Sequence, residues 1–561
     1  MLDFALDKKL WENVRVSPDF ALHRKEINEL YEKSFKVAPR PHSAREIFEN
    51  NDNGLWRLQF DQIQSSALMA LIYPDNEEYY NNLVDTLWAL LNEYSWAPIG
   101  HFSPYYYGKT AADFDCGLID IFAASHAFAL AEIKNLFKDR FPALLTDRIT
   151  YEIRRRAIEP YLKKKFFWET HDNNWTAVCT GSIGAVLMYE APELFIANQE
   201  RIHRSMECYL ASYKDDGMSV EGVGYWTFGF GFFASFALLE REFTNGEVNW
   251  FENPKVKEIS KFLQKTFLQR DVLLTFSDSS VKQRYFLGVP HMLRYVYGDE
   301  IEALPSTLAN VVWDNTHFNF ALRGFIYYDT SAVSDQINQN VTYSVQNSAY
   351  FFKRTPYYGF AVKGGNNGES HNHIDVGSFI LARDNKQIIC DIGAGPYEDG
   401  YHTEKRYTHF NPSAYAHSIP MIDGVGEDDI RRDDVIAQYD EENNCVTLDF
   451  TTTYSDAIRS EKLSSAVRKF TLDNDRITLL DSFELKKSVK ITERFVSIVE
   501  PTVTENGVMI DDVLLSTRDS IAPTVSYRDV RYHNQAGTYR VYMIDYDTDK
   551  SDFEITFIMG K

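Results

Sequence analysis

A dense run of titratable side chains spans residues 369–375, which read Glu-Ser-His-Asn-His-Ile-Asp and stand shortly before the apolar Phe379. If this run enters a strand, the alternation of side chains places His371, His373 and Asp375 on one face. Two imidazoles and a carboxylate are ligands that Zn²⁺ and similar ions accept. The run therefore predicts a metal site in the second half of the chain.

Two further polar residues strengthen this interpretation. Asp391 ends the apolar segment Ile388–Cys390, and His417 follows a short Ala-Tyr-Ala sequence. Taken singly, such a His or Asp is more often a turn or hydrogen-bond residue, but three such pieces in one β-rich region favour a metal site. Thiolate ligands are not expected, because the cysteines are scattered and form no CxxC pair. These are Cys116, Cys179, Cys208, Cys390 and Cys445.

Two other clusters lie in the first half. Glu221, Tyr225 and Trp226 come just before an apolar segment that starts at Phe228, and an Asn-Asn-Trp sequence at residues 173–175 precedes a segment rich in small residues. A phenol or carboxylate at a helix start is well placed for work at the rim of a cleft. The alternative is structural: an acidic N-terminal residue with core aromatics in the first cluster, and a helix cap in the second.

The elements that must position these groups change character near residue 330. Before it, apolar residues recur at helical spacing in segments such as 67–72, 83–91 and 122–137, which are separated by short joints such as 73–76. This pattern predicts stacked helical hairpins over residues 1–330. No fixed repeat length is visible, so a regular solenoid is not expected.

After a polar, aperiodic linker at 331–347, the pattern alternates with period two, which predicts an all-β domain over residues 341–561. Residues 468–472 and 476–480 flank an Asp-Asn-Asp turn, and Asn506-Gly507 suggests a second hairpin with a type I′ turn. Many short strands imply a β-sandwich. The expected fold class is thus α+β multidomain, with helices first and an antiparallel sandwich second.

Composition excludes several classes of protein. The 561 residues are 44% hydrophobic and 25% charged, which is typical of a globular chain, and the net charge of −23 argues against nucleic acid as a partner. The longest apolar run, residues 228–239, is too short to span a membrane. No basic or apolar signal region follows Met1, which indicates a cytoplasmic protein, or a periplasmic or secreted one if a signal was removed. The oligomeric state is left open.

In this order, the clusters resemble the heparinase II/III-like polysaccharide lyases over approximately residues 165–485. The most specific match is the run His-Asn-His-Ile-Asp-Val-Gly-Ser-Phe that begins at His371. The resemblance implies an incomplete (α/α) toroid joined to a β-sandwich, in agreement with the change in pattern near residue 330. It also implies a carbon-oxygen lyase that cleaves uronic-acid-containing polysaccharides by β-elimination and leaves 4,5-unsaturated uronate ends.

The resemblance also assigns roles to residues. Asn174 matches the family's residue that neutralises the uronate carboxylate, with Asn173 as the alternative register. Tyr225 and His371 match its catalytic tyrosine and histidine. If proton and leaving oxygen depart from one face, Tyr225 serves as base and acid; if they depart from opposite faces, His371 is the base. The sequence does not choose between these.

Further positions follow from the same comparison. The family's metal-binding positions match His373, Asp391 and His417, and the implied cofactor is one structural divalent ion, Zn²⁺ rather than Mn²⁺ or Ca²⁺. Trp175, Glu221, Trp226, Tyr401 and Arg406 are expected to contact substrate, with Tyr397 as the alternative to Tyr401 and a surface ion pair as the alternative role for Arg406. In several relatives a His stands where Trp175 follows Asn174 here.

The implied substrates are glycosaminoglycans such as hyaluronan, chondroitin sulfate or heparan sulfate, followed by alginate-type chains. One alternative is an inverting glycoside hydrolase, which needs two carboxylates ~6.5–9.5 Å apart. The candidate pairs are Asp216 with Glu221 and Asp113 with Asp115. The other alternative is a non-catalytic carbohydrate-binding protein in which Tyr225 and Trp226 stack on sugar.

Overall fold

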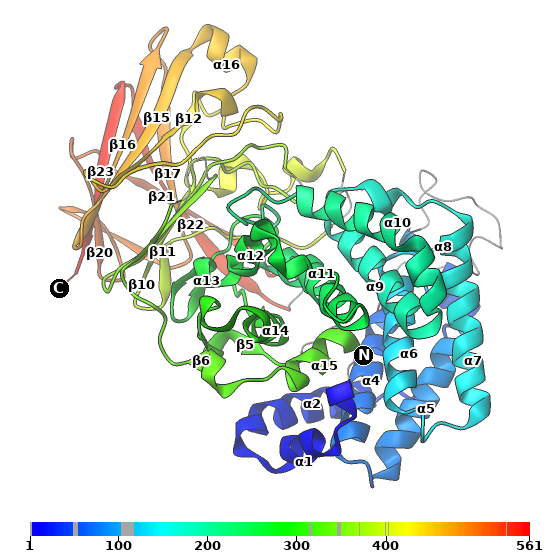
Figure 1. Ribbon diagram of the computed structural model, residues 1–561. Helices are drawn as coiled ribbons and strands as arrows, with labels where there is room; N and C mark the ends of the chain where they lie inside the picture. The colour runs from blue at the N-terminus through cyan, green and yellow to red at the C-terminus, as the bar shows by residue number, and fades with distance from the viewer. Residues whose placement is uncertain are drawn as a thin grey trace.

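The computed structural model describes most of the chain. The described residues are 3–48, 54–101, 117–312, 317–344, 349–369, 371–398, 400–401, 403–533 and 536–560. Helices fill the first half and antiparallel sheets the second, and the two halves pack side by side (Figure 1). The predicted α+β fold class is confirmed.

The helical half contains all three segments in which apolar periodicity predicted helices. The fifteen described α-helices of this half are α1 (Lys8–Val16), α2 (Ala21–Ser34), α3 (Ala44–Phe48), α4 (Gly54–Ile72), α5 (Glu77–Leu91), α6 (Ile121–Leu136), α7 (Ala143–Ile153), α8 (Glu159–Lys163), α9 (Asn174–Glu190), α10 (Pro192–Ala211), α11 (Val223–Phe243), α12 (Pro254–Ser260), α13 (Phe262–Thr266), α14 (Gly288–Tyr297) and α15 (Phe318–Ile326).

Helix α9 lies at the centre of the packing, with α6, α10 and α11 against it. It is apolar on all sides, and a glycine permits the closest approach: a Cβ on Gly184 would meet the Phe236 ring of α11 at 2.5 Å. Helix α15 packs on both α4 and α6, which returns the end of the helical half to its beginning. The His23 ring of α2 also meets the carbonyl of Gly324 in α15 at 3.2 Å. The helices thus form an incomplete (α/α) toroid.

The second half forms three larger antiparallel sheets (Figure 1). The five-stranded sheet contains β7 (Val341–Tyr343), β8 (Tyr350–Arg354), β9 (Gly359–Lys363), β10 (Phe379–Arg383) and β11 (Lys386–Ile389). The four-stranded sheet contains β12 (Met421–Ile422), β17 (Ile491–Ser497), β22 (Thr538–Thr548) and β21 (Thr524–Arg531). The eight-stranded sheet contains β13 (Gln438–Asp440), β14 (Cys445–Asp449), β15 (Leu463–Leu472), β16 (Arg476–Leu485), β23 (Asp552–Met559), β20 (Val513–Thr517), β19 (Gly507–Ile510) and β18 (Pro501–Thr504).

The five-stranded sheet belongs to two cores. Ala361 and Ile380 lie in the hydrophobic core of the helical half, whereas their neighbours Phe360 and Phe379 lie in the core of the sandwich. Successive side chains of a strand point to opposite faces, so one face covers the toroid and the other faces the eight-stranded sheet. Both faces are buried, which explains why these strands read as continuous apolar runs.

Both predicted hairpins are present, but one turn differs from expectation. Strands β15 and β16 pair around residues 473–475, as predicted. Strands β18 and β19 pair around Glu505 and Asn506, but neither of these has a positive φ; only Gly507, at φ 135°, does. The type I′ assignment was therefore wrong, because the glycine is the first residue of the returning strand rather than the second residue of the turn.

The predicted linker contains short strands. Val333–Ser334 (β6) pairs in parallel with Leu304–Pro305 (β4), and β7 is the edge of the five-stranded sheet, while residues 345–348 lie outside the described part. The predicted division between residues 330 and 341 falls in this segment and stays a prediction.

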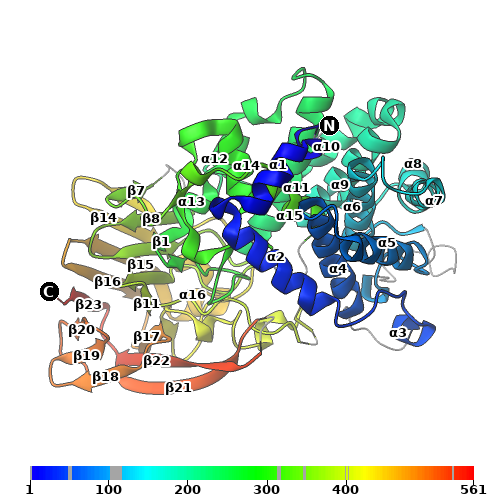
Figure 2. The same ribbon diagram turned by 90° about the horizontal axis from the view of Figure 1, so that it is seen from below.

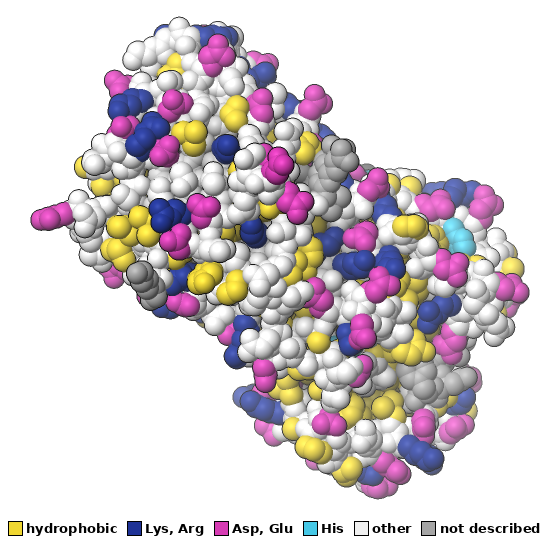
Figure 3. Space-filling model, turned by 60° about the vertical axis from the view of Figure 1, so that its left-hand side comes forward, with side chains coloured by type: hydrophobic (Ala, Val, Ile, Leu, Met, Phe, Trp, Pro, Cys, Tyr) yellow, Lys and Arg dark blue, Asp and Glu magenta, His cyan; other side chains and the backbone are white. Residues whose placement is uncertain are grey.

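Acidic and basic side chains are mixed on one face of the molecule (Figure 3). On the face seen in Figure 3, Lys and Arg stand among Asp and Glu rather than in a patch of one sign. No helix within the described ranges is long and apolar enough to cross a bilayer.

Candidate active site and metal centre

The N-terminus of α11 brings the first aromatic group to the junction between the two halves. Gly222 caps this helix with φ 93°, and a Cβ at that position would lie 2.4 Å from Ser279 Oγ. The chain can therefore enter α11 directly against the loop around Ser279 only with glycine at this position. Tyr225 follows in the first turn of the helix.

Tyr225 is half-buried and contacts two residues from the β half. Its ring stacks on His371 with centroids 3.9 Å apart, and its hydroxyl lies 3.1 Å from the hydroxyl of Tyr397. Burial, together with the nearby Asp278 carboxylate, raises the pKa of the Tyr225 phenol above its ordinary value. The phenol is therefore fully protonated at neutral pH and is suited to donating a proton.

The run at 371–375 is a loop before β10, so the expectation of one shared strand face was wrong. His371 adopts φ 54°, which turns the chain between the two histidines. As a result His371 faces Tyr225, His373 faces the interior of the β half, and Asp375 receives a hydrogen bond of 2.6 Å from the buried Lys363. Asp375 is thus a structural ion-pair residue.

Asp278 connects these groups and was missed by the sequence analysis. This carboxylate is 5% exposed. Its Oδ2 lies 2.8 Å from His371 Nδ1, and its Oδ1 lies 2.9 Å from the Tyr401 hydroxyl, 2.7 Å from an Arg406 nitrogen and 3.1 Å from His373 Nε2. Burial acts to raise the pKa of Asp278, but these hydrogen bonds and the charge of Arg406 hold it well below its usual range.

An ionised carboxylate only accepts hydrogen bonds, which fixes the tautomers of both histidines. His371 must donate through Nδ1, which leaves the lone pair of the neutral ring on Nε2. That atom points toward Glu221, whose Oε1 is 3.8 Å away. His371 is therefore oriented as a proton acceptor beside the protonated Tyr225.

The asparagine pair begins α9. Asn173 is the N-cap, and its Oδ1 accepts from Trp175 N at 3.1 Å, as the capping interpretation predicts. Asn174 is buried, and its backbone packs against Gly229 of α11, one helical turn from Tyr225 on the same face. Asn174 thus contacts the helix that carries Tyr225.

The indole of Trp175 borders the same region together with a residue that was not predicted. Its ring lies 5.1 Å from that of His101, whose Nδ1 is 2.5 Å from Asp120 Oδ2. His101 thus supplies an imidazole next to Trp175. A single His in a Pro-Ile-Gly-His-Phe sequence gave no signal of this contact.

The other predicted substrate contacts divide into two groups. Tyr401 and Arg406 lie at Asp278, and the Arg406 guanidinium stacks 4.5 Å over the Tyr401 ring, so neither is a surface residue. Tyr397 is 37% exposed beside Tyr225 and is the more accessible of the two tyrosines. Trp226 is fully buried and donates from its indole to the carbonyl of Ile259, so it does not face the site, and the core-aromatic alternative describes it.

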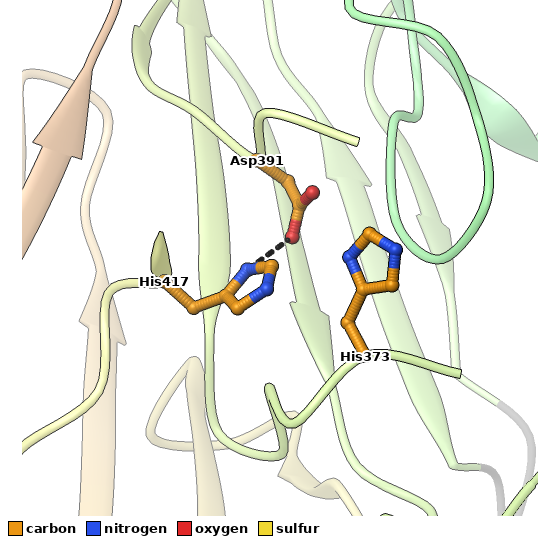
Figure 4. A group of neighbouring side chains, drawn as sticks. All are labelled: His373, Asp391 and His417. Carbon is orange, nitrogen blue, oxygen red and sulfur yellow. Dashed lines mark hydrogen bonds and ion pairs between the residues drawn. The ribbon is translucent and has the colours of Figure 1, made fainter. Parts of the chain in front are cut away.

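The predicted metal ligands converge from three loops (Figure 4). One ligand atom from each of His373, Asp391 and His417 lies within 4.8 Å of the others, and all three side chains are buried. His417 Nδ1 is 3.0 Å from Asp391 Oδ2. The three residues can hold a metal ion.

The hydrogen bonds around the cluster support a cation there. His417 Nε2 lies 3.0 Å from the carbonyl of Asn411, so it is the donor, and Nδ1 of a neutral ring then turns its lone pair toward the Asp391 carboxylate. His373 Nε2 donates to Asp278, and its buried Nδ1 has no hydrogen-bond partner within the described residues. Three acceptors thus face one another, an arrangement that a metal ion, or a proton on His417, stabilises.

For the hydrolase alternative, the structure describes one of the two candidate carboxylate pairs, Asp216 with Glu221. Asp216 is buried, and its Oδ1 accepts from the backbone of Met218 at 3.0 Å in a turn. Asp113 and Asp115 lie outside the described residues.

No protein-family model and no curated protein matches the sequence. Among solved structures, the chain is similar to heparinase III, with 13% identity, a TM-score of 0.62, and 99% of this chain and 85% of that chain covered. It is also similar to a mutant of the heparan sulfate lyase HepC from Pedobacter heparinus (12%, 0.58, 99% and 93%). A third match is the Streptomyces coelicolor A3 chondroitin AC lyase in complex with chondroitin sulphate (11%, 0.55, 100% and 82%). The chain shares the fold of these proteins over its full length.

Proposed function

We propose that this protein is a lyase that cleaves uronate-containing polysaccharides by β-elimination, with glycosaminoglycans as the substrate class. The observation that carries the proposal is the stacked pair of Tyr225 and His371, with Asp278 behind the histidine, at the junction of a toroid and a sandwich. An inverting hydrolase needs two carboxylates instead, and Asp216, a member of the described candidate pair, is buried in a turn where it accepts from the backbone of Met218. The shared fold with heparan sulfate and chondroitin lyases supports the same conclusion.

In the proposed reaction, His371 Nε2 takes the proton from C5 of the uronate. The electron pair of the C5–H bond forms the C4–C5 double bond, and the bond from C4 to the leaving oxygen breaks. The Tyr225 hydroxyl gives its proton to that oxygen, and the stacked imidazolium of His371 returns a proton to the phenolate. Tyr225, protonated at neutral pH, is assigned as the acid because the hydrogen bond from His371 Nδ1 to Asp278 leaves the Nε2 lone pair of His371 for the base role.

The C5 proton is weakly acidic, because its loss places a second negative charge beside the carboxylate. Asn174, which packs on Gly229 of α11 one helical turn after Tyr225, donates a hydrogen bond to that carboxylate and stabilises the developing enolate. Asp278 does not touch substrate in this scheme. It orients His371 and holds Arg406 and Tyr401 at the floor of the site.

A divalent ion, with Zn²⁺ favoured by the N₂O ligand set, is held by His373, Asp391 and His417. It supplies structural cross-linking of three loops rather than a nucleophile. Asp278 couples this centre to the site, because one carboxylate contacts both the ligand His373 and the base His371.

The test is ultraviolet absorbance during incubation with hyaluronan, chondroitin sulfate, heparan sulfate, heparin or alginate. The unsaturated uronate formed by elimination absorbs, and a hydrolysis product does not. We expect absorbance to rise with at least one polymer, and Tyr225→Phe to lower the rate by ~10³-fold or more while polymer binding is kept. Tyr295→Phe, on an exposed residue of α14, is the matched control.

A flat absorbance trace with new reducing ends would contradict the lyase and favour the hydrolase, for which Glu221→Gln should be the inactivating change. A flat trace without cleavage, together with polymer binding that Tyr225→Phe leaves intact, would identify a carbohydrate-binding protein.

A further inference from the structure

Strands β21 and β22 form an arm that extends from the sandwich toward the loops at the domain junction (Figure 2). Strand β17, the other neighbour of β22, ends at Ser497 opposite Tyr542. Beyond that pair, from Val541 to Thr538, β22 is bonded to β21 on one side, and no described strand pairs with its other edge. A pocket with a volume of about 290 Å³ lies along this edge.

The pocket is built from three tyrosines and charged side chains. Its lining residues include Tyr532, Tyr539 and Tyr542, together with Lys282, Arg540 and Glu500. Tyr532 and Tyr539 stack on each other with centroids 4.7 Å apart, and Tyr539 is anchored by a hydrogen bond of 3.1 Å to the carbonyl of Ile392. These rings are therefore held in place before any ligand binds.

The two cations of the pocket, Lys282 and Arg540, differ in their partners. Lys282 is exposed, and its Nζ lies 4.1 Å over the Tyr532 ring. Arg540 is already paired with Asp529 at 2.8 Å and covers Tyr527. Lys282 is thus the cation best placed to meet an anionic group that approaches the Tyr532 ring.

This chemistry suits a sugar that carries a carboxylate or sulfate. The C–H face of a pyranose ring is apolar and packs on an aromatic face, while tyrosine and lysine supply donors for hydroxyl and anionic groups at its edge. Glu500 can accept hydrogen bonds from sugar hydroxyls.

A row of side-chain contacts connects the pocket with the candidate active site. His533, next to Tyr532, places its ring 4.4 Å from that of Tyr397, whose hydroxyl meets Tyr225. On the other side, the loop that carries Asp278 continues within four residues to Lys282. A chain bound at Tyr225 that extends over Tyr397 and His533 is directed to Tyr532.

We propose that this pocket on the β21–β22 arm is a remote subsite that binds a further sugar unit of the polysaccharide whose uronate occupies the Tyr225 site. The inference rests on the proposed function and adds the requirement for a long substrate. The subsite acts by binding alone and forms no covalent bond.

The experiment compares Tyr532→Ala and Lys282→Ala with the wild type on two substrates: the polymer that the wild type cleaves and a tetrasaccharide of that polymer. We expect each variant to raise KM for the polymer about 10-fold with kcat unchanged, and to leave the tetrasaccharide kinetics unaltered. Tyr295→Ala, on a distant exposed tyrosine of α14, should change neither.

Equal losses on both substrates, or no loss on the polymer, would overturn the subsite while leaving the lyase proposal intact. If the wild type cleaves none of hyaluronan, chondroitin sulfate, heparan sulfate, heparin or alginate, the same variants are run in native gels that contain each polymer. Retardation of the wild type that drops in both variants supports the subsite even then. Absent or equal retardation overturns it.

Discussion

At the scale of single residues, the Asp278 carboxylate accepts hydrogen bonds from four side chains and is nearly inaccessible to water. A buried charge of this kind is costly unless it is fully paired. Its partners are two imidazoles, a phenol and a guanidinium, so the same interactions that stabilise the charge also fix three groups of the site. The orientation of the His371 ring therefore depends on Asp278, which does not touch substrate in the proposed reaction.

Asp278→Asn should separate positioning from folding. The side-chain amide of the variant has an NH₂ group in place of one carboxylate oxygen. This NH₂ group faces one of the donors that Asp278 accepts from, and His371 can then adopt the tautomer that carries its proton on Nε2. We expect kcat to fall by about 100-fold or more at temperatures at which the variant is folded, and the melting temperature to fall as well, because Arg406 loses its buried charged partner. Steady-state absorbance assays and thermal unfolding measure the two effects.

Asp384→Asn, at an exposed turn, is the control for that substitution. Unchanged kcat in Asp278→Asn would show that His371 needs no carboxylate behind it.

The metal centre makes a separate prediction. His417→Ala removes one ligand, and we expect the purified variant to lose the one divalent ion per chain that elemental analysis should find in the wild type. Loss of an ion bound only by the folded state should lower the melting temperature by at least ~5 °C. A chelator should destabilise the wild type but not the variant; a wild type without metal would refute the centre.

Sequence pattern singled out residues that the fold brings together, but it did not reveal their contacts. The residues of the 371–375 run were singled out by type and spacing, but their divergence depends on one positive φ at His371, which no periodicity reveals. Asp278 escaped notice because it stands in a Thr-Phe-Ser-Asp-Ser-Ser sequence 93 residues before His371 and gains its role only through tertiary contact.

At the scale of elements, the start of α11 decides where Tyr225 stands. Two glycines flank this start with different constraints: Gly222 has φ 93° and touches the Asp278 loop, whereas a Cβ on Gly224 would meet nothing within 4 Å. The same substitution at Gly222 and at Gly224 therefore compares a constrained position with an unconstrained one within three residues.

Gly222→Ala should destabilise the protein by about 1–3 kcal/mol and lower activity, because the added methyl forces the helix away from Ser279. Gly224→Ala should be neutral, or stabilising by up to ~1 kcal/mol, because alanine favours the helix. Urea unfolding with parallel activity assays tests both. Equal effects of the two substitutions would refute the constraint at Gly222.

Element types were predictable where the local pattern was strong, as in the long helices and in the β15–β16 hairpin. The type of turn before Gly507 was not, because a two-residue loop can place its glycine either in the turn or just after it. The fate of Trp226 was also open, since a helix start at a junction has one face toward the site and one toward the core.

At the scale of the whole molecule, buried acids tie stability to pH. Glu427 is 6% exposed and accepts hydrogen bonds of 2.8 Å from Asn367 and Thr453. Burial raises the pKa of Glu427 from 4.5 to about 8. The folded state therefore retains a proton that the unfolded chain releases between these values.

The retained proton therefore contributes to the free energy of unfolding. This contribution of Glu427 is fully present below pH 4.5 and is lost as pH rises to about 8. Each pKa unit corresponds to about 1.4 kcal/mol. We expect the melting temperature of Glu427→Gln to gain on the wild type steadily across this range. Exposed Glu505→Gln is the control, and a pH-independent difference for Glu427→Gln would contradict the assignment.

The order of helices and strands could be predicted from the sequence, but the way the two halves share the five-stranded sheet could not. Continuous apolar strands indicate burial on both faces without saying what covers each face. Ala361 and Ile380 belong to one core, and Phe360 and Phe379 belong to the other. This division can be recognised only once the positions of the toroid and the eight-stranded sheet are known.

This shared sheet has a consequence for how the chain is made. During synthesis the helical half leaves the ribosome first. The apolar face of the toroid that packs on the five-stranded sheet stays exposed until strands β8 to β10, which end at Arg383, have emerged. Those strands then expose their second face until β23, at the very end of the chain, closes the sandwich. Folding during synthesis therefore proceeds in two steps. A nascent chain that stops between them exposes one apolar face of the five-stranded sheet, which chaperones can bind.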